Sequence, residues 1–232
     1  MPAVPVLGQS RALDRRDHLL TGSNGSHQTM KKLVKPFRAF LGFILAAVLL
    51  AAFAPVEKTL GVNARLVYFH GAWVWVALLC FAAAALAGLA GLITRHAALH
   101  AWSRALGRVG LLFWIIFLGM SLLVMQANWN GLYLDEPRFR VPLNFAIIGL
   151  LLQAGLSFFP NPAWTSLANL IFGSALLYTM SGVQTVLHPD SPVLQSQISG
   201  IQIFFAGEVL LLCLAAWQLA WLLLKLEQKR RG

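Results

Sequence analysis

The chain contains six long segments that are almost free of charged side chains. A transmembrane helix needs about 20 consecutive, mostly apolar residues to cross a hydrocarbon core about 30 Å thick. The segments that meet this requirement are Phe37–Ala54, Leu66–Ile93, Val109–Ala127, Val141–Phe159, Trp164–Val186 and Ile198–Leu224. The sequence therefore predicts an all-α polytopic membrane protein, with residues 37–224 forming a six-transmembrane-helix bundle in the lipid bilayer.

Composition supports this class. Of the 232 residues, 58% are hydrophobic and only 11% are charged, whereas about a quarter are charged in a typical soluble domain. The net charge of +10 comes from basic residues beside the apolar segments, which indicates membrane topology and no nucleic-acid partner. Cys80 and Cys213 lie in different segments without a Cys-x-x-Cys spacing, so we interpret them as buried structural thiols.

The fifth segment is the weakest, because polar residues dilute it: Thr165, Ser166, Asn169, Ser174, Thr179 and Ser181. Such a helix suits the interior of a bundle, where hydroxyl and amide groups find partners. The second segment carries the small-residue spacings Ala84-x-x-x-Gly88 and Ala87-x-x-x-Gly91, which allow another helix to approach closely.

The two ends of the chain are polar. Residues 1–36 are irregular and have no apolar run before Phe37, which predicts a disordered cytoplasmic tail. Within it, Met30 opens a basic and then apolar stretch typical of the start of a bacterial membrane protein, so we hypothesise that Met30 is the true initiator. Residues 225–232 form a basic cytoplasmic C-terminal tail.

Orientation follows from the Lys and Arg residues that flank the segments, because cytoplasmic loops carry an excess of them. With the N-terminus inside, the inner flanks hold Lys31, Lys32, Lys35, Arg38, Arg95, Arg104, Arg108, Lys225, Lys229, Arg230 and Arg231. The outer loops hold only Lys58, Arg65, Arg138 and Arg140. Both termini are therefore predicted to be cytoplasmic in a bacterial inner membrane, and the external loops are Pro55–Arg65, Asn128–Arg140 and Leu187–Gln197.

This topology sorts the histidines. His96 and His100 fall in a cytoplasmic loop and have no nearby acid or thiol to complete a metal site, so we interpret them as part of a solvated basic helix. His70 and His188 fall at the outer surface. Taken singly, His70 is consistent with a structural residue among interfacial aromatic residues, and His188 with a loop residue before a proline turn.

Taken together, His70 and His188 are able to ligate one metal centre from opposite sides, and two imidazoles suit the iron of a b-type haem. A haem also needs a flat aromatic surround and cations for its propionates. The candidates for these roles are Trp73, Trp129, Tyr133, Arg65, Arg138 and Arg140.

The sequence resembles the cytochrome c assembly family, in particular haem-handling proteins of the haem exporter protein C type. The matching stretch is "GVNARLVYFHGAWVW", residues 61–75, in which His70 aligns with the first axial haem ligand; "TVLHP" places His188 at the second. The loop "WNGLYLDEPR" resembles the family's tryptophan-rich haem platform at Trp129, Tyr133, Asp135 and Arg138, and the platform's other aromatic positions are replaced.

The resemblance implies a haem-binding protein of cytochrome c biogenesis that makes and breaks no bonds. The partners it implies are an ABC-transporter-like haem exporter complex, a small membrane subunit and a periplasmic haem chaperone. Two alternatives remain open from the residues. One is a b-type haem protein that transfers electrons from quinol, and the other is a structural subunit that has lost its haem. No nucleophilic triad or phosphate-binding loop indicates an enzyme.

Three acidic residues lie in or beside the predicted helices. Glu208 lies about ten residues into the sixth segment, where a carboxyl group is costly. We expect either a structural hydrogen bond to Gln153, Asn144 or Asn169, or a role in proton or cofactor handling. Asp135 and Glu136 precede Pro137, which indicates a surface turn.

Overall fold

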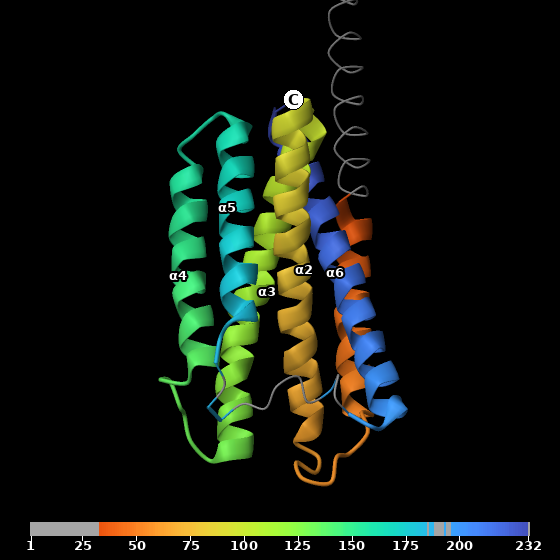
Figure 1. Cartoon of the computed structure of the whole chain (residues 1–232). Coiled ribbons are helices and arrows are strands. Elements are labelled where there is room, and N and C mark those ends of the chain that lie inside the picture. The colour runs from red at the N-terminus through yellow and green to blue at the C-terminus, as the bar shows by residue number, and fades with distance from the viewer. Residues whose placement is uncertain (1–32, 185, 188–192, 194–195, 232) are drawn as a thin grey trace, which may run out of the picture.

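The computed structural model describes residues 33–184, 186–187, 193 and 196–231. Within these residues the chain forms helices and no β-strand, which confirms the all-α prediction (Figure 1). The helices are a first helix, Leu33–Ala52, and then α2 (Ala64–Thr94), α3 (Ala97–Trp129), α4 (Pro137–Leu156), α5 (Pro162–Ser181) and α6 (Ser199–Arg231).

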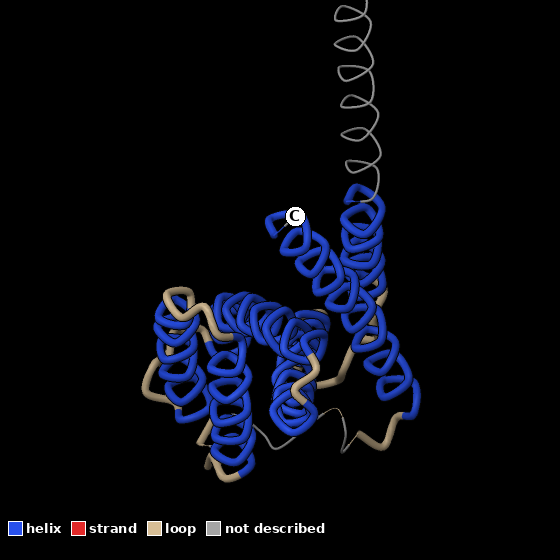
Figure 2. The backbone as a smooth tube through the Cα atoms, turned by 90° about the horizontal axis from the view of Figure 1, so that it is seen from above, coloured by secondary structure: helices blue, strands red, loops and turns tan. Residues whose placement is uncertain are grey.

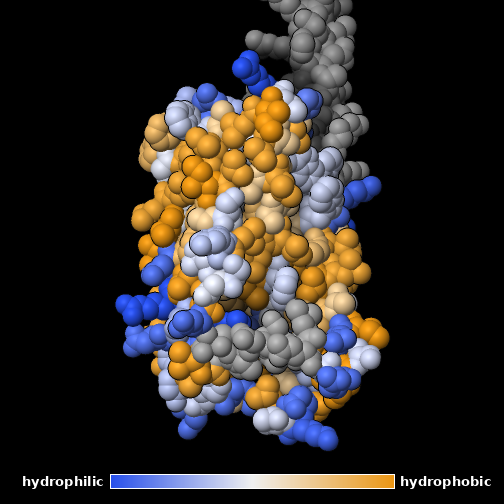
Figure 3. Space-filling view, viewed as in Figure 1, coloured by the Kyte–Doolittle hydropathy of each residue, from blue (hydrophilic) through white to orange (hydrophobic). Residues whose placement is uncertain are grey.

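Five of the described helices are long and apolar enough to cross a membrane: the first helix, α2, α3, α4 and residues Ser199–Lys229 of α6. Figure 3 shows apolar side chains over the middle of one face and polar side chains gathered toward both ends. The remaining helix, α5, coincides with the segment diluted by Ser, Thr and Asn, and three of its polar residues, Thr165, Ser166 and Asn169, are buried.

Helices α2 and α3 form the centre of the bundle. They pack against each other and both contact α5 and α6. The first helix lies on the outer side of α6 (Figure 2), where a Cβ added to Gly207 would be 3.4 Å from Leu50. Helix α4 lies on the opposite flank and packs on α3 and α5. Its position against α3 is fixed by the indole N–H of the fully buried Trp114, which donates to the Pro142 carbonyl at 2.9 Å.

The small-residue spacings of α2 do bring helices close. A Cβ added to Gly88 would lie 2.7 Å from the Ser166 carbonyl oxygen of α5, and one added to Gly91 would lie 3.0 Å from Nδ1 of His100 in α3. The separation at Gly88 is shorter than real Cβ contacts, so a glycine is required there, whereas the one at Gly91 is tight and would need His100 to shift by a few tenths of an ångström.

The polar residues of α5 find partners as expected. Asn169 Nδ2 donates to the Ser103 carbonyl at 2.8 Å and to its Oγ at 3.1 Å, while its Oδ1 accepts from Gln153 Nε2 at 3.3 Å. His100 Nδ1 lies 2.6 Å from Ser166 Oγ. This network satisfies buried polar groups that are costly to leave unpaired in an apolar bundle.

The interpretation of His96 and His100 as part of a solvated basic helix is right for His96, which is exposed directly before α3, and wrong for His100, which is buried. Arg95 adopts a left-handed conformation with φ 57°, and its backbone N–H donates to the Gly91 carbonyl at 2.8 Å. This residue ends α2. After His96, α3 begins at Ala97, twelve residues before the predicted start at Val109. Because α3 therefore packs along α2 from its first turn, His100 is buried.

The chain ends also extend the helices. Residues 33–36 belong to the first helix, and α6 continues through the predicted C-terminal tail to Arg231. Residues 1–32, including Met30, lie outside the described residues. The described parts of the 53–63, 130–136 and 182–198 connections lie together at the lower end in Figure 1, and the C-terminus lies at the opposite end. The charge pattern predicted that these three connections lie on one side of the membrane and the C-terminus on the other, and the structure places them at opposite ends of the bundle.

We predict that Gly88→Ala destabilises the protein by about 1–3 kcal/mol, because the added methyl group collides with backbone that cannot move without separating α2 from α5. The matched control is Gly119→Ala in α3, where nothing lies within 4 Å of the new Cβ. Thermal unfolding in detergent measures both. Equal midpoints for the two variants would contradict the close approach.

Candidate functional site at the loop-rich end

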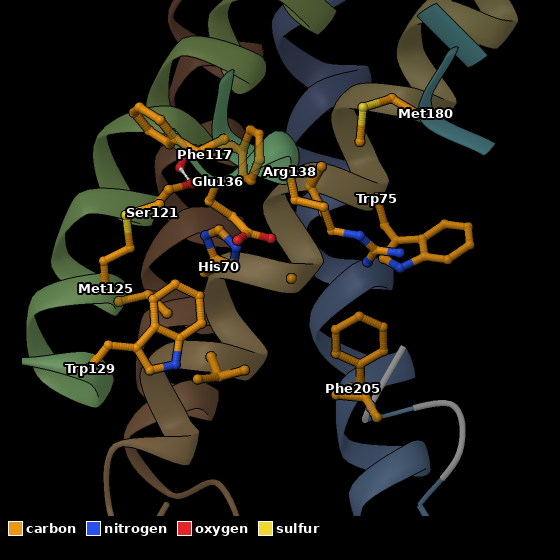
Figure 4. Close-up of a pocket in the computed structure, with 16 residues that line it drawn as sticks. His70, Trp75, Phe117, Ser121, Met125, Trp129, Glu136, Arg138, Met180 and Phe205 are labelled. Carbon is orange, nitrogen blue, oxygen red and sulfur yellow. Dashed lines mark hydrogen bonds between the residues drawn. The ribbon is translucent and has the colours of Figure 1, made fainter. Parts of the chain in front are cut away.

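A cavity of about 150 Å³ lies at the end of the bundle where the three long connections gather. It is built from α2, α3, the start of α4, the end of α5 and the start of α6, so it brings together segments from most of the chain (Figure 4). Its walls are mainly apolar and aromatic, and the residues that matter for its chemistry are His70, Phe117, Trp129, Glu136, Arg138 and Phe205.

His70 lies in the second turn of α2 and faces this cavity. The side chain is only 8% exposed, and its ring packs on Phe117 of α3 with centroids 5.0 Å apart. The next residue, Gly71, lets α6 close the other side, because a Cβ there would lie 3.3 Å from the Phe205 ring. The imidazole therefore packs against α3, and α6 packs against the next residue of α2.

Two other predicted site residues lie at the same cavity. Trp129, at the C-terminal end of α3, and Arg138, in the first turn of α4, both line it with His70. The left-handed Asn130 that ends α3 turns the chain toward α4. The cavity thus combines an imidazole, an indole and a guanidinium group, which are the three kinds of group expected from the sequence.

Trp73 and Arg65 do not line this cavity. Trp73 is buried against Phe113 of α3, with ring centroids 4.5 Å apart, and belongs to the bundle core. Arg65 lies at the start of α2, where its Nε donates to the Ala54 carbonyl at 3.1 Å and holds the preceding loop. The aromatic residue of this turn that does reach the cavity is Trp75, which the sequence analysis did not select.

Tyr133 and Asp135 also lie outside it. The Tyr133 ring meets Trp129 edge-on with centroids 6.0 Å apart and is 44% exposed. The Asp135 side chain is fully exposed and forms an ion pair with Arg140 at 3.7 Å. The structure therefore places these two candidates on the surface, outside the cavity.

His188 lies outside the described residues, but described residues on both sides of it belong to the cavity region. Leu187, immediately before it, donates its backbone N–H to Glu136 Oε2 at 3.1 Å. Val193, five residues after it, is buried and lines the cavity.

Glu136 corrects the sequence analysis, which treated it together with Asp135 as a surface turn. The residue is only 5% exposed and lines the cavity with His70. Its Oε1 accepts the Val186 N–H at 3.2 Å and its Oε2 the Leu187 N–H. The partners lie about fifty residues later in the chain, so no local pattern could have shown that this acid is buried.

A second cavity, of about 470 Å³, adjoins the first and shares Val67 and Val193 with it. The residues that line it include Tyr68 and Glu57. Glu57 accepts the Leu60 N–H at 2.9 Å, and this hydrogen bond lowers the pKa of the Glu57 carboxyl group. The Tyr68 hydroxyl is buried and has no hydrogen-bond partner among the described residues.

The two cavities allow a test of whether a haem fits. The donor set fits, because an imidazole in an aromatic wall with a cation beside it matches what haem iron and propionates require. The first cavity alone does not fit, since small-molecule sites typically occupy about 300–1,000 Å³. The second cavity has that size but contains neither His70 nor Arg138, so a haem on His70 fits only by extending from the first cavity into the second. Among the described residues no group of three or more His, Cys, Asp and Glu side chains forms a protein-only metal site.

Glu208 lies one helical turn beyond Phe205 in α6 and is 0% exposed. Neither carboxyl oxygen has a hydrogen-bond partner among the residues that the structure describes. The expected partners are engaged elsewhere or exposed: Gln153 and Asn169 bond each other, and Asn144 lies on the surface of α4. A structural bond to any of these three is therefore absent, and the carboxyl group is an unsatisfied polar group in the core.

Together, the apolar helices and the loop-rich end define a multi-pass helical membrane protein with a cavity near one end of the bundle. Comparison with models of known protein families gives no match, and comparison with curated proteins gives none either.

We predict that Glu208→Leu raises the midpoint of thermal unfolding, because it removes two unsatisfied oxygens whose burial costs about 1–3 kcal/mol. Glu208→Gln is the matched control, since its amide stays unsatisfied and gives no comparable gain. Melting of the detergent-solubilised variants measures the difference. A Leu variant less stable than wild type would show that the carboxyl group has a stabilising partner in the membrane.

Proposed function

We propose that this chain is a haem-binding membrane protein of cytochrome c biogenesis. The observation that carries the proposal is the placement of His70, which is buried against Phe117 in an aromatic cavity that also holds Trp129 and Arg138. Groups separated by up to 68 residues in the sequence converge there, and they are the types of residue that a haem site needs.

The proposed roles follow from the chemistry of each group. His70 and His188 ligate the iron of a b-type haem, Trp129 covers the macrocycle, and Arg138 neutralises a propionate. When bound, the haem supplies a redox-active iron; the chain itself supplies binding and orientation and acts as no enzyme. The family resemblance extends the proposal to partners: an ABC-transporter-like haem exporter complex, a small membrane subunit and a periplasmic haem chaperone.

The same proposal includes the topology. All six helices, α5 included, cross a bacterial inner membrane with both termini in the cytoplasm. The excess of Lys and Arg at the end of the bundle opposite the cavity supports this orientation. The buried polar groups of α5 support its inclusion, because a helix that buries these groups against α2 and α3 keeps an apolar face for lipid.

Electron transfer from quinol is the second candidate function. It uses the same proposed ligands, since a b-type haem held by His70 and His188 is able to carry electrons. Rapid reduction of the bound haem by a soluble quinol analogue would favour this function over haem delivery.

We predict that protein purified from haem-replete cells shows Soret and α bands. The variant His70→Ala is expected to lose most of this absorbance, because it removes a buried imidazole that is a proposed axial ligand. His188→Ala tests the second proposed ligand in the same way. The control is His96→Ala, which alters an exposed residue at the other end of the bundle. Absorption spectra normalised to haem per chain measure the effect.

A colourless wild-type protein, or unchanged spectra in the double His70→Ala, His188→Ala variant, would contradict the haem proposal. The first of these results would instead support a structural subunit that has kept the scaffold without the cofactor.

We predict that cysteines introduced at Lys58 or Asp135, both exposed, react with a membrane-impermeant maleimide in cells whose outer membrane has been permeabilised. A cysteine at His96 reacts only after the inner membrane is opened. The native thiols give a small background, since Cys80 is buried and Cys213 is half-buried. The reverse labelling pattern would invert the proposed orientation.

A further inference from the structure

Glu136 joins three segments at the cavity. It precedes α4, where its backbone N–H donates to the Tyr133 carbonyl at 3.1 Å and its own carbonyl accepts the Phe139 N–H at 2.9 Å. Its carboxylate accepts the Val186 and Leu187 N–H groups at 3.2 and 3.1 Å. The side chain is therefore fixed at its base by the α3–α4 turn and at its tip by the segment after α5.

The same carboxylate faces the proposed ligand. Glu136 and His70 line one cavity, and Figure 4 shows the carboxylate pointing toward the His70 ring. An ionised carboxylate can accept about four hydrogen bonds. The two backbone N–H groups use two of these positions, so the others remain for a group in the cavity. Its negative charge lies in a mainly apolar surround, where charges act on each other more strongly than in water.

We propose that Glu136 is a positioning residue of the haem site. The inference rests on the proposed haem function and adds a role that the sequence analysis did not assign. Through its hydrogen bonds the carboxylate fixes the segment that ends at Leu187, and through its charge it stabilises the more positive, ferric state of a haem on His70. In other metal sites, carboxylates near ligating imidazoles orient these ligands and tune the metal.

Asp135 is the matched comparison. It is the neighbouring carboxylate, but it does not line the cavity. Its side chain is fully exposed, and its ion pair with Arg140 spans 3.7 Å at the surface. The variants Glu136→Gln and Asp135→Asn each remove one negative charge at adjacent positions with little change in shape. Only the first removes a carboxylate from the cavity.

The first measurement is hydrogen–deuterium exchange of the full-length, haem-free protein in detergent. We expect peptides that contain Val186 and Leu187 to exchange faster in Glu136→Gln than in wild type, while Asp135→Asn matches wild type. Unchanged exchange in peptides from α2 and α3 shows that both variants are folded. Equal exchange of the Val186 and Leu187 peptides in all three proteins would overturn the anchoring role.

The second measurement is titration of the same proteins with haem, followed by redox titration. We expect Glu136→Gln to bind haem about 10- to 100-fold more weakly and to have a more positive midpoint potential, with Asp135→Asn unchanged in both. An unchanged affinity and potential in Glu136→Gln would overturn the positioning role. If wild type binds no haem, the proposed function fails with it, and the exchange data still report separately on the anchor.

Discussion

The fold depends on how closely other helices approach α2. Inside a bilayer no hydrophobic force draws one apolar helix to another, so close packing and internal hydrogen bonds must hold the bundle together. Gly88 and Gly91 allow α5 and α3 to reach van der Waals distance of the α2 backbone, and Gly71 does the same for α6. Helix α2 therefore fixes its neighbours on several sides, and His70, one residue before Gly71, is placed by the same contacts.

The two ends of the bundle each contain a buried histidine, and the surroundings of the two side chains differ. His100 lies against Gly91 and has Ser166 Oγ 2.6 Å away, within a network that also satisfies Ser103 and Asn169. That end is closed by the short α2–α3 connection. At the other end the long connections leave a cavity beside His70. A buried imidazole in a closed polar network stabilises the fold, whereas one beside a cavity is accessible to a ligand, so the difference in surroundings assigns the two histidines different roles.

Much of the fold follows from local pattern, and the site follows from it only in part. Runs of apolar residues located the helices, because this property can be seen in neighbouring residues. Dilution by polar residues marked α5 as an interior helix only in part. Thr165, Ser166 and Asn169 are buried, whereas Ile171 and Tyr178 on the other face are exposed. The start of α3 was missed, since the basic residues near His100 resemble a solvated loop until the packing with α2 is known. Trp73 and Trp75 illustrate the same limit: only the rotation of α2 in the bundle decides which indole faces the cavity.

Asp135 and Glu136 show why adjacent acids resist assignment from sequence. Pro137 begins α4 and fixes the direction in which the helix leaves the loop. The residue directly before it points back across the bundle end, where Val186 and Leu187 offer two backbone N–H groups, while the residue before that projects outward to Arg140. Both side chains are carboxylates at adjacent positions of one turn, yet one is exposed and the other is buried. A buried acid needs donors that only the folded chain supplies, so tertiary contacts, and not the turn itself, determine which of the two belongs to the cavity.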